Sequence, residues 1–280
     1  MYDRVRVEAL ARQWLAEDIG HGDLTAELML DADAVGRFHM NARQSLVVAG
    51  IEVAAVVYRC TDPAVTFERR VRDGERVEKG ALLAVISGPA RALVTAERTA
   101  LNIVQHLSGI ATETARYVAA IAGTRAIMID TRKTTPGLRM LEKHAVVCGG
   151  GRNHRLGLDS GVLLKDNHIA VCGSIAAAVQ RARVAVPVLT RIEVECDRLD
   201  QVEEAVAAGV DMILLDNMAP EQLRAAVALV AGRVPLEASG GVRYETVRAI
   251  AETGVDFISS SKITQSAPAV DIGLDEPAQG

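Results

Sequence analysis

Five basic side chains lie close together along an acidic chain: Arg132, Lys133, His154, Arg155 and Lys165. The formal net charge of the whole chain is −5, so these residues do not belong to a generally basic surface. An arginine guanidinium binds carboxylates and phosphates through two parallel hydrogen bonds. The cluster therefore predicts an anion site, and the number of basic groups predicts a ligand with several negative charges.

Two carboxylates end neighbouring apolar segments. Glu195 follows Ile192–Val194, and Asp216 follows Met212–Leu215. These acids could bind sugar hydroxyls, hold Mg²⁺ or stabilise a developing cation. Alternatively, they could simply neutralise lysines of the cluster in ion pairs. Mg²⁺ in proteins often takes one or two carboxylates together with substrate phosphates, so Glu195 and Asp216 are the candidate metal ligands.

Two loops rich in small residues follow later apolar segments. The first is Ser239–Gly241 and the second is Ser259–Lys262. Glycine lets backbone N–H groups approach oxygens closely, and a helix N-terminus adds a favourable field for an anion. The alternative for each loop is a tight turn that needs glycine. Together, in this order, the loops predict a phosphate site.

The chain that must position these residues alternates short apolar strands with helices of about ten residues. Parallel strands joined in this way take right-handed crossovers, and a (β/α) barrel places its chemistry at the carboxyl ends of its strands. Six strands are evident, so we expect an incomplete or open barrel. A doubly wound sheet is the competing fold, but its usual Gly-x-Gly-x-x-Gly after the first strand is missing. The expected strands lie at 126–129, 161–164, 192–194, 212–215, 234–238 and 256–258, and the helices at 174–184, 199–208, 220–230 and 244–253.

The first ninety residues follow a different pattern, which predicts a small α+β unit with an antiparallel sheet. A helix is expected at the start, with Val5, Val7, Leu10 and Trp14 on one face, ending near Gly20. Alternating residues predict strands at 37–48 and 64–71, and an apolar run predicts another at 81–86. A long helix is expected from residue 90 to 122, with Gly109 bending or ending its first part. Its apolar face is predicted to hold Leu93, Ala96, Ala100, Ile103, Val104 and Leu107.

Composition excludes several classes of protein. Hydrophobic residues make up 49% and charged residues 24%, which is typical of a globular protein. The acidic balance argues against a general nucleic-acid binder, and no apolar run approaches the roughly 18 residues of a membrane span. The start reads as an amphipathic helix rather than a signal peptide, and the four scattered cysteines as reduced thiols, so we expect a cytoplasmic protein. Patterns typical of zinc sites, serine hydrolases and Walker loops are missing from the sequence.

The segments Thr131–Arg139 and Gly149–Leu158 resemble the quinolinate phosphoribosyltransferase family, also called nicotinate-nucleotide pyrophosphorylase (carboxylating). The resemblance covers nearly the whole chain. It continues through Gly20–Thr25, Ala96–Asn102, Lys165–Ile169, Ile192–Glu195, Leu215–Met218, Glu237–Gly241, Thr264–Ala267 and Asp271–Leu274.

The resemblance implies a fold, a reaction and an assembly. The fold is an N-terminal α/β sandwich (1–105), an incomplete (β/α) barrel (106–268) and a C-terminal segment (269–280) that packs back on the first domain. The reaction joins quinolinate to phosphoribosyl pyrophosphate and gives nicotinate mononucleotide, CO₂ and pyrophosphate, with Mg²⁺. The family works as a dimer or larger assembly.

The resemblance also assigns roles to residues. It implies that Arg132, Arg155 and the backbone near Thr131 hold the quinolinate carboxylates, and that Lys133 and Lys165 lie between the two substrates. Glu195 and Asp216 hold ribose hydroxyls, directly or through Mg²⁺, and these acids with the two lysines are the expected catalytic residues. Arg98 enters the site of the neighbouring subunit. The 5′-phosphate is expected at Ser239, Gly240, Gly241, Ser260, Ser261 and Lys262.

Three alternatives stay open from the sequence. The first is a paralogue with the same fold and another substrate, such as the protein associated with molybdate-transport operons. The second is a Schiff-base aldolase with Lys133 or Lys165 as the nucleophile, and the third is an anion-binding module without catalysis. One departure bears on the phosphate site, because many relatives have glycine where this chain has Ser261.

Overall fold

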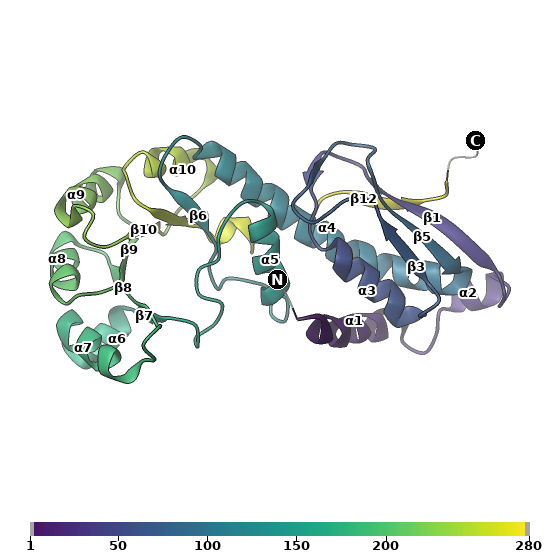
Figure 1. Ribbon diagram of the computed structural model, residues 1–280, viewed down its shortest axis with the longest axis horizontal. Coiled ribbons are helices and arrows are strands. Elements are labelled where there is room, and N and C mark those ends of the chain that lie inside the picture. Colours follow the sequence, from purple (N-terminus) through teal and green to yellow (C-terminus); the bar gives the residue numbers. More distant parts are fainter. Residues whose placement is uncertain (1–2, 278–280) are drawn as a thin grey trace. The chain divides into compact units, whose positions relative to one another are not determined.

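The computed structural model describes residues 3–277 as two compact units (Figure 1). The first unit contains the described residues within 1–115, 140–150 and 267–280, and the second contains 116–139 and 151–266. The last three residues of the C-terminal segment predicted from the sequence, 278–280, lie outside the described range. None of the helices in residues 3–277 is both long enough and apolar enough to cross a membrane.

An antiparallel sheet forms the centre of the first unit, in the strand order β12-β1-β5-β3. The outermost strand comes from the far end of the chain, since Met40 of β1 pairs with Leu274 of β12. A second, two-stranded sheet pairs β2 with β4. The elements of this unit are α1 (Arg4–Ile19), α2 (Leu24–Met29), β1 (Val35–Ala42), β2 (Leu46–Val47), α3 (Ile51–Thr61), β3 (Thr66–Arg69), β4 (Arg76–Val77), β5 (Leu82–Pro89), most of α4 (Ala90–Ala120), most of α5 (Arg139–Cys148) and β12 (Ile272–Asp275).

The first helix begins and ends as predicted, and its buried face overlaps the predicted one. The Asp3 carboxylate caps its N-terminus by accepting a hydrogen bond from the Val5 N–H, and Gly20 ends it with a positive φ of 57°. The buried residues are Val7, Ala11 and Leu15, at the spacing of one helix face. Val5, which we expected on that face, is 77% exposed. Val7 is buried and Leu10 and Trp14 are half-buried, so the prediction was wrong only for Val5, and it passed over the small residue Ala11.

The apolar face predicted for the long helix α4 is confirmed. All six of its predicted residues, Leu93 to Leu107, are buried. Gly109 neither ends the helix nor interrupts it, since α4 runs on to Ala120. A Cβ atom at Gly109 would lie 2.1 Å from the Pro268 carbonyl oxygen. The glycine therefore lets the chain after residue 267 pass directly over the helix.

Six parallel strands form the sheet of the second unit, in the order β6-β11-β10-β9-β8-β7. All six strands predicted from the sequence are present, and β6 and β7 form the two edges of the described sheet, so the barrel is incomplete as expected. The elements are β6 (Ile127–Ile129), β7 (Val162–Leu164), α6 (Asp166–Cys172), α7 (Ile175–Ala185), β8 (Ile192–Cys196), α8 (Leu199–Ala207), β9 (Met212–Asp216), α9 (Pro220–Val230), β10 (Leu236–Ser239), α10 (Tyr244–Ala251), β11 (Phe257–Ser259) and the short 3-10 helix η1 (Ser261–Ile263).

Strand register decides which side chains share the face that carries the site. Successive residues of a strand point to opposite faces of the sheet, so residues two positions apart point to the same face. Glu195 of β8 and Glu237 of β10 each pair with Leu214 of β9, so the three form one row across the sheet. Asp216 pairs with Ser239 in the next row toward the carboxyl ends. The acids and the serine therefore face the same space.

Candidate active site

A pocket of about 690 Å³ lies at the carboxyl ends of these strands and gathers most of the predicted site. It holds the basic residues, the two acids and the first small-residue loop. The predicted residues that line it are Thr131, Arg132, Lys133, His154, Arg155, Lys165, Glu195, Asp216, Ser239, Gly240 and Gly241.

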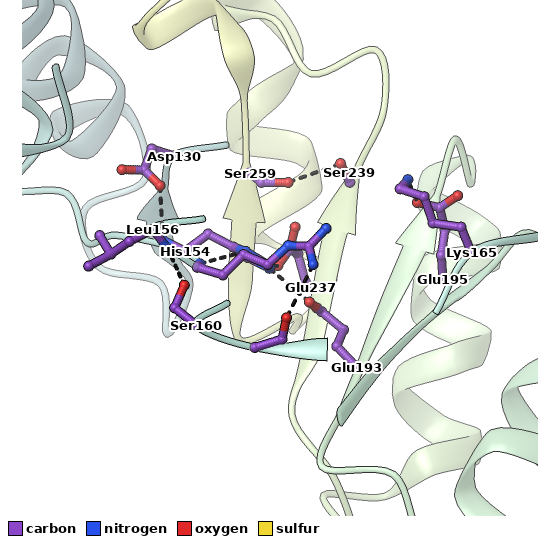
Figure 2. A network of polar contacts seen from close by, with 12 residues as sticks. Asp130, His154, Leu156, Ser160, Lys165, Glu193, Glu195, Glu237, Ser239 and Ser259 are labelled. Atoms are coloured by element: carbon purple, nitrogen blue, oxygen red, sulfur yellow. Dashed lines mark hydrogen bonds and ion pairs between the residues drawn. The ribbon is translucent and has the colours of Figure 1, made fainter. Parts of the chain in front are cut away.

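Lys165 and Glu195 form an ion pair inside this pocket (Figure 2). Lys165 follows β7, and its backbone N–H donates to His168 Nδ1, which caps α6. The Lys165 side chain is 43% exposed and that of Glu195 is 18% exposed. The ion pair considered from the sequence therefore exists, and it also leaves both charged groups facing the pocket, where a ligand can reach them.

A buried cluster of His154, Glu193 and Glu237 lies beside the pocket (Figure 2). His154 Nε2 donates to Glu193 Oε2 at 2.8 Å and lies 3.4 Å from Glu237 Oε2, an ion-pair distance. Burial by itself would lower the pKa of His154, but the two carboxylates outweigh it and raise the pKa to about 10. Burial raises the pKa of Glu237, whose side chain is 1% exposed.

The segment that carries His154 is fixed by Asp130 at the end of β6. Asp130 is fully buried, and its carboxylate accepts hydrogen bonds from the His154 N–H at 2.9 Å and from Asn153 Nδ2 at 2.6 Å. The Arg155 N–H points at His154 Nδ1 at 2.8 Å, a contact that favours the neutral ring and so opposes the effect of the two carboxylates. Both ring nitrogens of His154 thus have partners within the protein, so its direct contact with a substrate stays a prediction.

Arg132 and Arg155 line the same pocket, and their like charges interact unfavourably. Burial and then the charge of Arg132 lower the pKa of Arg155. Arg155 also donates to the Gly161 carbonyl at 3.2 Å, which holds its guanidinium in place. An anion with two carboxylates would relieve the repulsion between the two guanidinium groups.

A smaller pocket of about 150 Å³ adjoins this site and contains the second small-residue loop. It shares Lys133 and the Ser239–Gly241 loop with the larger pocket and adds Ser260, Ser261 and Lys262. Among residues 3–277 only Asn217 and Ala231 have positive φ without being glycine. Ser261 therefore keeps an ordinary backbone conformation, and a glycine is not required there.

Gly240 has a steric reason to be glycine. Its φ is +84°, and a Cβ atom would lie 2.2 Å from Asn217 Oδ1. Asn217 in turn donates to Asp216 Oδ2 at 2.7 Å. The close approach of Gly240 to Asn217 thus fixes the side chain that holds Asp216.

Several residues of the site were not predicted. Glu193 and Glu237 each stand in the middle of an apolar strand, and this interruption was the available indication. Arg139 lines the larger pocket and Arg243 the smaller one, but neither stands in a distinguishing sequence pattern. Among the predicted residues, Arg98 lies elsewhere: it is exposed on α4, in the first unit.

Fold and pocket together define a class of protein: an α/β protein with a parallel barrel sheet and a pocket lined by basic and acidic residues at its strand ends. Two family models match the chain. The C-terminal domain of quinolinate phosphoribosyl transferase matches residues 110–275, and the N-terminal domain of the same family matches residues 23–108. The chain belongs to the quinolinate phosphoribosyltransferase family.

Individual relatives agree with the family models. The chain is 45% identical to the probable nicotinate-nucleotide pyrophosphorylase (carboxylating) of Synechocystis, over 96% of this chain and 92% of that protein. It is 40% identical to the probable enzyme of the same name from Bacillus subtilis, over 98% and 94% of the two chains. The crystal structure of NadC from Streptococcus pyogenes superposes with a TM-score of 0.94 at 40% identity, covering 98% of this chain and 97% of that one.

Proposed function

We infer that this chain transfers the phosphoribosyl group of phosphoribosyl pyrophosphate to quinolinate with decarboxylation. The products are nicotinate mononucleotide, CO₂ and pyrophosphate, in de novo NAD biosynthesis. Family membership supports this function, and one observation in the structure carries it: a single pocket joins a pair of arginines to two acids and a glycine-serine loop. These groups match, in turn, a dicarboxylate, a ribose and a phosphate.

The arginine side of the pocket is our proposed quinolinate site. The two carboxylates of quinolinate would lie between Arg132 and Arg155, with the backbone near Thr131 as a further donor. The unfavourable charge interaction between the arginines supports this assignment, because a bound dianion removes it. Planar guanidinium groups also fix the orientation of the pyridine ring, which a point charge would not.

The other side of the pocket is our proposed phosphoribosyl site. Ser239, Gly240 and Gly241 with Ser260, Ser261 and Lys262 would hold the 5′-phosphate through backbone N–H groups, hydroxyls and one ammonium. Glu195 and Asp216 would accept hydrogen bonds from the ribose hydroxyls. Their positions in neighbouring strands, facing the same space, support this assignment.

Mg²⁺ is proposed as the metal, held by Glu195 and Asp216 together with substrate oxygens. Carboxylate oxygens are the donors that Mg²⁺ prefers, and both acids line the pocket, so the residues fit the ion. When bound, Mg²⁺ neutralises charge on the departing pyrophosphate. Lys133 and Lys165 would add positive charge on the same side.

The order of the chemistry follows from the charges. As pyrophosphate leaves, ribose C1 becomes cationic, and Glu195 and Asp216 favour that charge. The pyridine nitrogen of quinolinate then forms a bond to C1 and becomes positively charged. The ring accepts the electron pair left when the adjacent carboxylate departs as CO₂, and that carbon takes up a proton. CO₂ release from quinolinate without phosphoribosyl pyrophosphate would contradict this order.

We propose a homodimer or larger homo-oligomer in which Arg98 reaches the site of a neighbouring subunit. The exposure of Arg98 on α4 supports this, because an exposed arginine on a packed helix is available to a partner. Mixing Arg98→Ala chains with Lys133→Ala chains tests the idea. If Arg98 acts across subunits, mixed dimers contain one intact site and regain activity, whereas a role within its own subunit restores none.

A cytoplasmic location stays a prediction, and some plant relatives are named chloroplastic or mitochondrial.

The function is tested by labelled CO₂ release from carboxyl-labelled quinolinate. We expect release that depends on phosphoribosyl pyrophosphate and falls at least about a hundredfold in Lys133→Ala. Lys79→Ala is the matched control, since Lys79 is an exposed lysine of the first unit. An unchanged rate in Lys133→Ala would remove Lys133 from the mechanism, and no release by the native chain would refute the function.

A further inference from the structure

A second group of side chains capable of chemistry lies in the first unit, apart from the residues assigned to the transferase. His144 and Cys148 stand four residues apart on α5 and therefore share one helix face. Asp73 lies in the turn between β3 and β4 and meets them there. All three side chains are partly buried.

Three potential ligand atoms converge at this point. His144 Nε2 lies 2.8 Å from Asp73 Oδ2 and 3.4 Å from Cys148 Sγ, and the three atoms are within 4.8 Å of one another. A single ring nitrogen offers either one proton or one lone pair, so two partners must share it. A cation between the three atoms would bind all of them.

The surroundings hold these groups in position. The second oxygen of Asp73, Oδ1, accepts a hydrogen bond from the Ile51 N–H at the start of α3, at 3.0 Å. The turn is packed against the end of α5, because a Cβ atom at Gly74 would lie 3.5 Å from the Cys148 carbonyl oxygen. Such a hydrogen bond to the oxygen that does not bind the metal orients a carboxylate ligand.

We propose that Asp73, His144 and Cys148 bind a zinc ion, with water as the fourth ligand. Thiolate, imidazole and carboxylate are the ligands that zinc takes, in tetrahedral geometry. Ideal bond lengths place sulfur and nitrogen about 3.5 Å apart, close to the 3.4 Å between Cys148 Sγ and His144 Nε2. Asp73 Oδ2 would move outward by about 0.6 Å to complete the tetrahedron.

Charge supports the same assignment. A thiolate and a carboxylate carry two negative charges, which a zinc ion neutralises, so the half-buried complex has no net charge. Zinc binds the thiolate form of cysteine, so binding displaces the proton of Cys148, and affinity should rise with pH. The ion would join the β3–β4 turn to α5 and take no part in the transfer reaction.

Cobalt provides the test, because a cobalt–thiolate bond gives a charge-transfer band in the near ultraviolet. Tag-free, chelator-treated full-length chain is titrated with Co²⁺, and Zn²⁺ is then added. We expect the band in the native chain and its loss on adding Zn²⁺. Cys148→Ser should abolish it, Asp73→Asn should weaken binding at least about tenfold, and Cys172→Ser, the control thiol on α6, should leave it unchanged.

The result that overturns the proposal is equally definite. Absence of the band, or a band of equal strength in Cys148→Ser, would show that these residues do not bind the metal. Circular dichroism of each variant confirms folding, and if Cys148→Ser fails to fold, Asp73→Asn decides. Transferase activity of the metal-free chain with Mg²⁺ should stay within about twofold of the zinc-loaded chain, so this test and that of the function can fail separately.

Discussion

Gly240 and Gly241 offer a matched pair of substitutions that tests the packing of the phosphate loop. Both have positive φ, +84° and +61°, and both line the same pocket. A Cβ at Gly240 would meet Asn217 Oδ1 at 2.2 Å and the Asn217 backbone nitrogen at 2.9 Å, whereas a Cβ at Gly241 would have nothing within 4 Å. Replacing each with alanine therefore separates steric conflict from backbone strain.

The expected magnitudes follow from these contacts. Alanine in a left-handed conformation costs about 1–2 kcal/mol at either position. Gly240→Ala adds an overpacking cost of about 1–3 kcal/mol, because Asn217 must move and its hydrogen bonds to Asp216 and to the Ser239 carbonyl weaken. We expect a loss of about 1–2 kcal/mol in the free energy of unfolding for Gly241→Ala and about 2–5 kcal/mol for Gly240→Ala.

Urea unfolding of the two variants and the native chain measures this difference, provided that the free energy of unfolding falls with urea concentration at the same slope in all three. Activity is not the discriminating measurement, since both glycines line the proposed phosphate site. Equal free energies of unfolding for the two variants would refute the steric argument. A larger loss for Gly241→Ala would show that the loop packs differently.

Three further predictions concern the buried cluster and the arginines. The pKa of His154 is raised from 6.5 to about 10, so its stabilising contribution is fully present below pH 6.5 and is lost as the pH rises through 10. The free energy of unfolding should therefore fall by up to about 5 kcal/mol between pH 6.5 and pH 10. The fall should be smaller in His154→Gln. Asp130→Asn should cost about 2 kcal/mol in urea unfolding, because a buried carboxylate that accepts from His154 and Asn153 is neutralised. Arg155→Lys should raise KM for quinolinate at least about tenfold and change KM for phosphoribosyl pyrophosphate much less, because lysine keeps the charge but lacks the planar guanidinium. An equal rise in KM for both substrates would contradict the assignment of Arg155.

The barrel sheet and the carboxyl ends of its strands could be predicted because each strand is a short apolar run with a charged or polar residue after it. Lys165, Glu195 and Asp216 were found in this way, and the strand register explains why they meet. Local sequence carries this information, since βα units follow one another along the chain.

Contacts between distant segments could not be derived from local patterns. The pairing of β12 with β1 joins residues more than two hundred positions apart. In the same way, the cluster of Asp73 with His144 and Cys148 brings together two residues, Asp73 and His144, that lie 71 positions apart in the sequence. His144 and Cys148 are closely spaced, but they form neither a His-x-x-x-His motif nor a cysteine cluster, and Asp73 is distant in the sequence.

The partners of buried polar residues could not be predicted from the sequence either. Glu193 and Glu237 alternate with apolar residues that face the opposite side of their strands, so the carboxylates point inward. An inward carboxylate is stable only with a partner, and that partner, His154, comes from a segment without regular structure. Its position is set by hydrogen bonds to Asp130 rather than by any periodic pattern.

The central claim is that one pocket couples ribose transfer to loss of CO₂, and product stoichiometry tests it most directly. Purified chain is incubated with quinolinate, phosphoribosyl pyrophosphate and Mg²⁺, and CO₂, pyrophosphate and nicotinate mononucleotide are quantified in the same reaction. The three products should appear in equal amounts, with none formed when either substrate is omitted. Pyrophosphate without CO₂, or CO₂ without nicotinate mononucleotide, would contradict the account.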